Sequence, residues 1–282
     1  MKFTAILMSV IFGALFLFAL PEANAAKSIH RATDGSEINL STLVEELSGA
    51  SVVVMGERHN SPDDHTAQRT LIQALADSGR KVALGLEMFE RSAQPLLDRW
   101  IAGTYDESSF ANLFASGWNP SWYSLYHGIF YYARQEGLPM VGLNIAPGYA
   151  SAVYREGTSS LPEEFREEVG TPTCDISEEY KAILSRALGG KTSPGGFTRF
   201  CQAQVLRDLT MASAGLDFLR KNEGYVLIIL TGNYHAWRLG IPEQIRRIDE
   251  SVTVKVVMPM SDEAFDAYGL LSREADYLWK VD

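Results

Sequence analysis

The chain has 282 residues, of which 46% are hydrophobic and 21% are charged, a balance typical of a globular protein. Acidic residues outnumber basic ones by 35 to 25, which gives a formal net charge of −10. This charge argues against a surface for nucleic acids or anionic membranes, because such surfaces need clustered Lys and Arg. No repeat with a period of roughly 20 to 50 residues occurs, so solenoids and propellers are excluded.

The first 25 residues have the features of a signal peptide. Lys2 precedes an almost wholly apolar run over 4–20, and Ala-Asn-Ala at 23–25 fits an A-x-A cleavage site. The alternative is an uncleaved anchor, because the apolar run is just long enough to span a membrane. No cysteine lies near the cleavage site for a lipid to modify. We therefore expect a periplasmic or secreted protein that is not a lipoprotein.

Export would place the two cysteines, Cys174 and Cys201, in an oxidising compartment, where disulfides persist. Two cysteines are too few for a disulfide scaffold, but one bond between them is expected, with two buried free thiols as the alternative. The chain has no C-x-x-C-H sequence, so a covalently attached c-type haem is excluded.

Short apolar runs rich in β-branched residues alternate with helical patterns along the chain. These runs cover residues 51–55, 81–87, 138–144, 225–231 and 252–258. Because they show little polar alternation, they predict strands covered on both faces, as in a parallel sheet. The predicted fold class is therefore α/β, a mainly parallel sheet with flanking helices plus a smaller inserted helical subdomain.

The helices predicted between these strands have recognisable ends. One begins at Ser61 with a first-turn proline and ends at Gly79. Another covers 122–136 and ends in a glycine, and a third opens with a proline at 242–249. These boundaries predict helices of ordinary length between the strands.

The interval 150–222 breaks this alternation because it is helical and polar throughout. It contains a Gly/Pro-rich bend at 189–196, followed by a long helix from about 198 to 222. We expect it to form the inserted subdomain. The expected division is a signal peptide at 1–25, an α/β sheet domain made of 26–149 and 223–282, and a helical subdomain at 150–222.

Polar residues follow directly on four of the apolar runs. In open α/β sheets, ligands bind beyond the carboxyl ends of the strands, so side chains at these ends are expected to share a pocket. The expected members are Glu57, His59, Glu87, Asn144 and His235.

Two kinds of chemistry are compatible with this set. His59 and His235 with the two carboxylates could bind a divalent metal with open positions, with His65 as a further ligand. Alternatively, one histidine acts as a general base on water while a glutamate fixes its tautomer. Neither H-E-x-x-H nor G-x-S-x-G occurs, so no established motif selects between the two.

A second group of residues is aromatic and crowds the interval 118–132, with His127 among the rings. At helical spacing, Trp122, Tyr126 and Phe130 fall on one face, and such a stripe is usually part of a core. The functional alternative is a wall for a large flat apolar ligand, with a tyrosine hydroxyl turned inward. A phenolate is a hard oxygen ligand suited to ferric haem.

Several segments, in the same order along the chain, resemble the ChaN-type haem-binding family. Gly-Glu-Arg-His-Asn at 56–60 with His65 and Gln68 looks like the family's opening motif. The segment 87–91 with Gln94 is similar to its E-M-F-x-R-x-x-Q sequence. The similarity continues through 122–133 with Asn144, through 204–208 with 211–212, and through 232–235 with 240–242.

This resemblance extends from about residue 40 to 280 and agrees with the predicted fold. It implies haem binding through a tyrosine, with His and Lys groups meeting the propionates. On the family's pattern Tyr126 is the expected iron ligand and Tyr123 the second choice, while Lys191 and His127 are candidates at the propionates. The resemblance also implies a haem-linked homodimer and a role beside an outer-membrane haem receptor. The chain departs from lipoprotein members because it lacks the acylated cysteine.

The same G-E-x-H, Glu and G-N-x-H elements also resemble a wider group of enzymes that includes erythromycin esterases and the TraB/Tiki proteins. There the equivalent His and Glu residues serve hydrolysis or metal binding. The alternative function is therefore a periplasmic hydrolase with His59 as general base, Glu57 and Glu87 as its supports, and His235 as electrophile or second metal ligand. Both sites could belong to one protein.

Overall fold

A computed structural model describes residues 28–189, 195–261 and 274–281. The predicted signal peptide and Lys191 lie outside these residues. Within the described part of the chain, no helix combines the length and the apolar character needed to cross a membrane.

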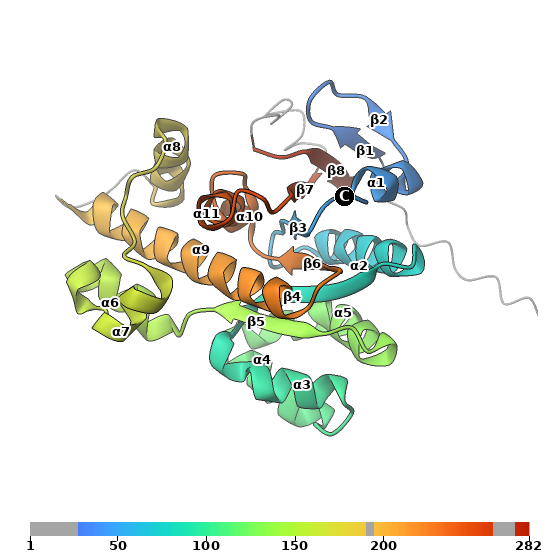
Figure 1. The fold of residues 1–282 in the computed structure, drawn as a ribbon, viewed down its shortest axis with the longest axis horizontal. Helices are drawn as coiled ribbons and strands as arrows, with labels where there is room; N and C mark the ends of the chain where they lie inside the picture. Colours follow the sequence, from blue (N-terminus) through green and yellow to red (C-terminus); the bar gives the residue numbers. More distant parts are fainter. Residues whose placement is uncertain (1–27, 190–194, 262–273, 282) are drawn as a thin grey trace, which may run out of the picture.

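One mixed sheet of eight strands forms the centre of the molecule (Figure 1), in the order β2-β1-β8-β7-β3-β6-β4-β5. Every neighbouring pair from β8 to β5 is parallel, whereas β1 pairs antiparallel with both β2 and β8. The strands are β1 (Ser28–Arg31), β2 (Glu37–Ile38), β3 (Val52–Met55), β4 (Lys81–Glu90), β5 (Met140–Asn144), β6 (Tyr225–Leu230), β7 (Val254–Ser261) and β8 (Tyr277–Val281).

The predicted α/β class and all five predicted strands are confirmed, as β3 to β7. Strands β1, β2 and β8, which extend the sheet at its antiparallel edge, were not predicted from the sequence. β1 is short and mostly polar and β2 has only two residues, so neither gives a period that a pattern can reveal.

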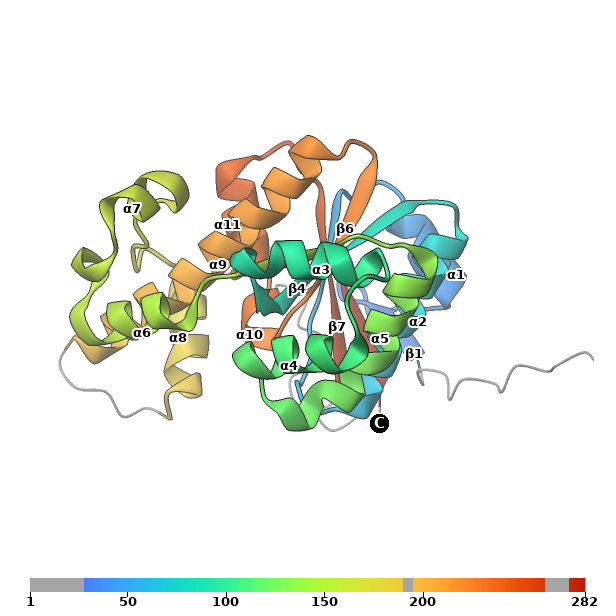
Figure 2. The same ribbon diagram turned by 90° about the horizontal axis from the view of Figure 1, so that it is seen from below.

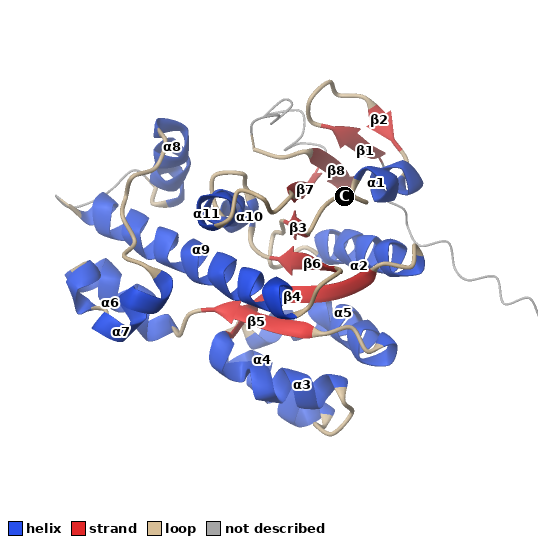
Figure 3. Cartoon of the chain, in the orientation of Figure 1, coloured by secondary structure: helices blue, strands red, loops and turns tan. Residues whose placement is uncertain are grey.

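Helices cover both faces of the sheet (Figure 3), and each face has its own hydrophobic core. Because side chains alternate along a strand, Val53 and Met55 enter one core while Val52 and Val54 enter the other. The first core contains residues of α1 (Leu40–Glu46), α2 (Pro62–Asp77), α3 (Gln94–Ile101), α4 (Glu107–Gly117) and α5 (Tyr123–Glu136). The second contains residues of α9 (Gly196–Lys221), α10 (Asn233–Ala236) and α11 (Ile241–Ile248).

The edge strand β5 is capped by a side chain rather than by another strand. The Gln94 amide nitrogen donates to the Met140 carbonyl oxygen at 2.8 Å, and its oxygen accepts from the Gly142 N–H at 3.1 Å. The Gln94 side chain thereby pairs with one backbone acceptor and one donor that a further strand would use, which protects an exposed edge from pairing with other chains. Short 3-10 helices occur at Arg91–Ala93, Pro120–Trp122 and Thr158–Ser160.

In its described residues, the interval between β5 and β6 holds helices and no strand. Figure 2 shows α6 (Pro147–Glu156), α7 (Glu163–Val169) and α8 (Glu178–Ala187) gathered around one end of α9, to one side of the sheet. Two small apolar clusters hold them there, one containing Val153 and Leu206, the other Tyr180 and Leu184. The predicted disulfide between Cys174 and Cys201 is confirmed and joins the segment before α8 to α9.

Candidate functional site

A cavity of about 670 Å³ opens at the carboxyl ends of the central strands. This is the edge at which open α/β sheets bind their ligands, and the volume is that of an ordinary small-molecule site. Polar residues form one part of the lining: Glu57, Arg58, His59, Glu87, Gln204, Arg207, Asn233 and His235. Larger apolar and aromatic side chains form the rest, among them Trp118, Tyr234, Trp237, Met258 and Met260.

Glu57, just after β3, is buried and accepts hydrogen bonds at both carboxylate oxygens. His59 Nδ1 lies 2.8 Å from Oε1, and the Tyr126 hydroxyl donates to that same oxygen. The Gln68 amide donates to Oε2 at 2.7 Å, and His65 Nδ1 lies 3.7 Å from it. Hydrogen bonds with three side chains therefore fix this carboxylate, which in turn fixes the His59 ring.

The His59 ring enters the cavity between two tryptophans. Its centroid lies 4.9 Å from Trp118, edge to face, and 5.5 Å from Trp122 in a stacked arrangement. Burial lowers the pKa of His59, but the Glu57 and Glu87 carboxylates outweigh that effect and leave it raised. A Cβ atom on Gly232 would lie 2.7 Å from His59 Cε1, so a glycine is required there for the ring to occupy this position.

Glu87 occupies an irregular stretch of β4, where the register with β5 shifts between Leu86 and Glu90. Bulges of this kind commonly re-aim a side chain beside a functional site. The Thr231 hydroxyl and the Gly232 N–H donate to Oε2 at 2.6 and 2.7 Å, and Arg207 donates to Oε1 at 2.7 Å. Burial raises the pKa of Glu87, but nearby positive charge and these hydrogen-bond donors have the larger effect and lower it to about 2.

His235 is held on the far side of Glu87 by a second buried carboxylate. Its Nδ1 lies 2.5 Å from Asp208 Oδ1, and its Nε2 lies 3.6 Å from Glu87 Oε1. The Tyr180 hydroxyl donates to the other Asp208 oxygen at 2.9 Å. Burial raises the Asp208 pKa, although the interaction with His235 works against this shift.

The two histidines are thus arranged alike, each with Nδ1 on a buried carboxylate. This bond assigns the proton of the neutral ring to Nδ1 and leaves Nε2 as the free nitrogen. In this tautomer Nε2 can take a proton from water, whereas a ring that also carries a proton on Nε2 can donate that proton. The nearby Arg207 can polarise a carbonyl oxygen. The described residues contain no group of three or more His, Cys, Asp or Glu side chains placed to hold a metal ion.

Four of the five residues predicted to share a pocket do so: Glu57, His59, Glu87 and His235. Asn144 does not line the cavity, because its amide donates to the Glu87 carbonyl oxygen at 2.8 Å and its oxygen accepts from the Ile145 N–H. It therefore holds β5 against the irregular stretch of β4. His65 lies behind the cavity, with its ring nitrogens on Gln68 and on the His59 carbonyl oxygen.

Sequence patterns missed several residues that line the cavity or support its lining. Arg207 and Asp208 sit in the middle of α9, where nothing local separates them from other polar residues of a long helix. Only the similarity of the segment 204–208 to a family motif pointed to them. No sequence feature indicated that Trp237 and Met258 line the cavity, because single apolar residues are usually part of a core.

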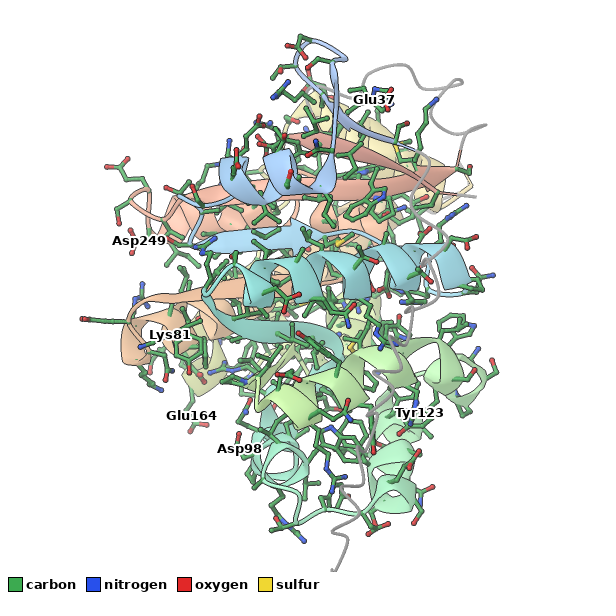
Figure 4. All side chains as sticks on the ribbon, turned by 90° about the vertical axis from the view of Figure 1, so that its right-hand side faces the viewer. Glu37, Lys81, Asp98, Tyr123, Glu164 and Asp249 are labelled. Atoms are coloured by element: carbon green, nitrogen blue, oxygen red, sulfur yellow. A yellow bond between two sulfur atoms is a disulfide. The ribbon has the colours of Figure 1, made fainter. Side chains whose placement is uncertain are left out.

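The aromatic helix α5 lies beside this cavity, and its three predicted ligand residues have different surroundings. Tyr126 is completely buried, and its hydroxyl is bonded to Glu57. Tyr123, labelled in Figure 4, is only partly buried. Its ring packs against Phe114, and its hydroxyl has no hydrogen-bond partner within the described part of the chain. His127 is partly exposed, with Nε2 3.0 Å from Glu107.

Residues 43–245 match the model of a protein family described as haem-binding uptake, Tiki superfamily, ChaN. The fold is similar to that of ChaN from Campylobacter jejuni, a structure described as showing cofacial haem binding. The TM-score is 0.70 at 20% sequence identity, over 90% of this chain and 96% of the other. This comparison confirms the α/β architecture.

More distant similarities extend to proteins of other kinds. The type III effector HopBA1 matches with a TM-score of 0.50 at 12% identity, over 86% of this chain and 92% of the other. The protein RETICULATA-RELATED 5, chloroplastic, of Arabidopsis thaliana is 24% identical over 254 residues, which are 83% of this chain. The match covers 34% of that plant protein. The similarity to HopBA1 concerns the fold, the similarity to the plant protein concerns the sequence of one part of it, and neither carries a function over.

Proposed function

This chain belongs to the ChaN family of haem-binding uptake proteins in the Tiki superfamily, and on that premise we propose that it is an exported protein that handles haem and binds the haem iron through a tyrosine of α5. The single observation that carries the proposal is the family match over residues 43–245, which includes the whole of α5. Haem is accordingly the ligand that the family supports.

Tyr123 fits the role of iron ligand better than Tyr126. Its hydroxyl has no partner in the described residues, and a buried, unpaired hydroxyl is costly unless a ligand satisfies it. When bound, ferric haem supplies a Lewis-acidic iron that favours a phenolate oxygen. Burial and the charge of Glu107 raise the Tyr123 pKa to about 12, so the phenolate would need iron to form near neutral pH.

Tyr126 would have to give up an existing interaction before it could bind iron. Its ring is buried among Phe114, Phe130 and His65, and its hydroxyl is bonded to Glu57. We therefore assign Tyr126 to the connection between α5 and the cavity, and Tyr123 with His127 to the haem side of the helix. His127 is 5.9 Å from the Tyr123 ring, close enough to contact the same ligand.

Export, dimer formation and a receptor partner belong to the same proposal. The disulfide between Cys174 and Cys201 supports export, because such bonds persist mainly in oxidising compartments. The exposed ring of Tyr131 stacks on His127 and extends the aromatic surface of α5. A haem-linked homodimer through this surface and delivery from an outer-membrane haem receptor are the proposed partners.

The test is a haemin titration of the chain 26–282, read by Soret absorbance and by elution volume. We expect saturable binding with a high-spin ferric tyrosinate spectrum, and elution at a larger size if haem joins two copies. Tyr123→Phe should abolish the tyrosinate bands, whereas Tyr126→Phe should retain them. Tyr225→Phe, at the amino end of β6 and thus away from α5, is the matched control and should keep the tyrosinate bands.

The reverse pattern would assign the iron to Tyr126 and would mean that Glu57 loses its bond to the phenol when haem binds. Absorbance that never saturates, with no tyrosinate bands in the wild-type protein, would contradict haem ligation by tyrosine altogether.

A second candidate function is hydrolysis in the strand-edge cavity, favoured by the two imidazoles held in the same way beside Glu87. We propose His59 as the general base, with Glu57 and Glu87 as supports. His235 in its doubly protonated form is the proposed electrophile, which donates its Nε2 proton to the leaving group. A metal-free reaction fits better than a metal-dependent one, because Arg207, Thr231 and Gly232 already bond to the Glu87 carboxylate.

Acyl esters and peptides with apolar bodies are the substrates to screen, since tryptophan and methionine side chains form much of the lining. His59→Ala should abolish turnover, and His235→Gln should lower it strongly. His127→Ala, which alters a histidine outside the cavity, should leave it unchanged. Equal rates for the wild type and His59→Ala would exclude this function.

A further inference from the structure

The helix α8 is attached to the rest of the protein by a disulfide next to the cavity. Cys174 lies in the segment before α8 and is bonded to Cys201, which is completely buried on α9, with 5.6 Å between their Cα atoms. The side chains of α8 pack in a small cluster with Val205, separate from the cores on the sheet. Figure 1 shows α8 standing beside the end of α9, away from the strands.

Cys201 of the disulfide and Asp208, which holds His235, lie on one face of α9. Cys201, Val205 and Asp208 are four and three residues apart, which places them in one row along a helix. The first turn of α8 covers this row with Tyr180, which is 1% exposed. The Tyr180 hydroxyl is 2.9 Å from Asp208 Oδ2 and 3.4 Å from the carbonyl oxygen of Tyr234.

Asp208 depends on this contact because its carboxylate is completely buried. One oxygen holds His235 Nδ1 and the other accepts from Tyr180. A buried carboxylate that loses a donor is left partly unsatisfied, so it rotates, takes up water or a proton, and no longer fixes its partner. The orientation of His235 in the cavity is thus linked to a side chain of α8.

We propose that Tyr180 is a positioning residue for His235 and that the Cys174–Cys201 disulfide keeps it in place, so that opening this bond loosens His235 in the cavity. A dithiol reductant opens the bond by two thiol–disulfide exchanges, after which both cysteines are thiols and the reductant is a cyclic disulfide. The inference deepens the second candidate function, on which its catalytic consequence rests.

The test follows the His235 Nδ1–H proton by NMR at low temperature, assigned by its absence in His235→Gln. In the wild type we expect a downfield resonance that exchanges slowly with water. Tyr180→Phe, which removes only the hydroxyl, should speed that exchange about tenfold or more. The double variant Cys174→Ala/Cys201→Ala and the reduced wild type should change it in the same direction.

Combining Tyr180→Phe with the double cysteine variant should add little, because both act through one contact. Tyr154→Phe is the matched control, since it is an exposed tyrosine of the neighbouring helix α6 and should leave the exchange rate unchanged. Amide spectra of the sheet residues verify that each variant is folded.

An unchanged rate in Tyr180→Phe would overturn the positioning role, and an unchanged rate in the cysteine variant would overturn the role of the disulfide. This readout does not require a substrate. Failure to find hydrolysis would therefore leave the proton measurement valid, whereas faster exchange without any turnover would confine the effect to structure. If a substrate is found, Tyr180→Phe should lower kcat more than it changes KM.

Discussion

The Tyr126 hydroxyl donates a hydrogen bond to Glu57 Oε1, the oxygen that also lies 2.8 Å from His59 Nδ1. One carboxylate therefore joins the aromatic helix α5 to the imidazole of the cavity. The Tyr123 hydroxyl, on the same helix, does not take part in this contact, because it has no hydrogen-bond partner in the described residues. Tyr126 is therefore the residue through which α5 and the cavity are connected.

Tyr126→Phe should destabilise the protein because it removes a buried hydrogen bond to a carboxylate and leaves the ring packing intact. The free energy of unfolding should fall by about 1.5 to 3 kcal/mol, the usual range for a hydrogen bond to a charged group. Urea unfolding followed by tryptophan fluorescence measures this change. Tyr131→Phe, at an exposed position of the same helix, should change it by less than about 0.5 kcal/mol. Equal effects of the two substitutions would argue against the Glu57 bond.

Gly232→Ala should displace His59, since the new Cβ atom would lie 2.7 Å from its Cε1 and 2.9 Å from its Nε2. Overpacking of this kind costs about 1 to 3 kcal/mol of stability. The His59 Cε1 proton should also shift in the NMR spectrum as the ring leaves its stacked position near Trp122. Gly49→Ala is the control, because a Cβ there meets no atom within 4 Å. An unmoved His59 resonance would show that the ring has space that the structure does not indicate.

Much of the fold was predictable because buried parallel strands are continuous apolar runs that a sequence displays directly. The same reasoning located Glu57, His59, Glu87 and His235, since strand ends meet at one edge wherever the strands lie in sequence. The antiparallel edge was missed because the register of β1 depends on β8, which is more than two hundred residues away.

The rest of the cavity depends on tertiary contacts that no local pattern encodes. Arg207 of α9 reaches Glu87 in the cavity, and the next residue, Asp208, holds His235 from behind. Tyr180 bonds to Asp208 from a different helix. The aromatic stripe illustrates the same limit. Helical spacing put Tyr126 on an inward face, but only the structure shows that Glu57 is its partner.

Loss of the disulfide should destabilise the protein by about 3 to 4 kcal/mol, the chain-entropy value for a closed loop of this length. The double variant Cys174→Ala/Cys201→Ala, unfolded in urea, tests this expectation. Adding a dithiol to the wild type should reproduce most of the loss, and adding it to the variant should have no effect. A further loss in the variant would mean that the reagent acts elsewhere than on this bond.

Glu87 should give stability a specific dependence on acid pH. Its pKa is about 2 in the folded protein against an ordinary value of 4.5, because charge from His235 and Arg207, together with hydrogen-bond donors, overcomes burial. A carboxyl group whose pKa is lower in the folded protein than in the unfolded chain stabilises the fold, and this stabilisation is fully present at a pH above the pKa of the unfolded chain. That contribution is lost as the pH falls from about 4.5 towards 2.

The measurement compares the wild type with Glu87→Gln by urea unfolding at several pH values. The variant should be less stable near neutral pH, since it leaves Arg207 without its buried partner. Between about pH 6 and pH 3 the difference in free energy of unfolding between the two proteins should narrow by about 2 kcal/mol. The reason is that only the wild type loses the ionised carboxylate. Glu136→Gln, at an exposed end of α5, is the control, and its free energy of unfolding should differ from that of the wild type by the same amount at every pH. A Glu87→Gln gap that stays constant or widens on acidification would show that the Glu87 pKa is not depressed, and that the positive groups around it do not stabilise its charge.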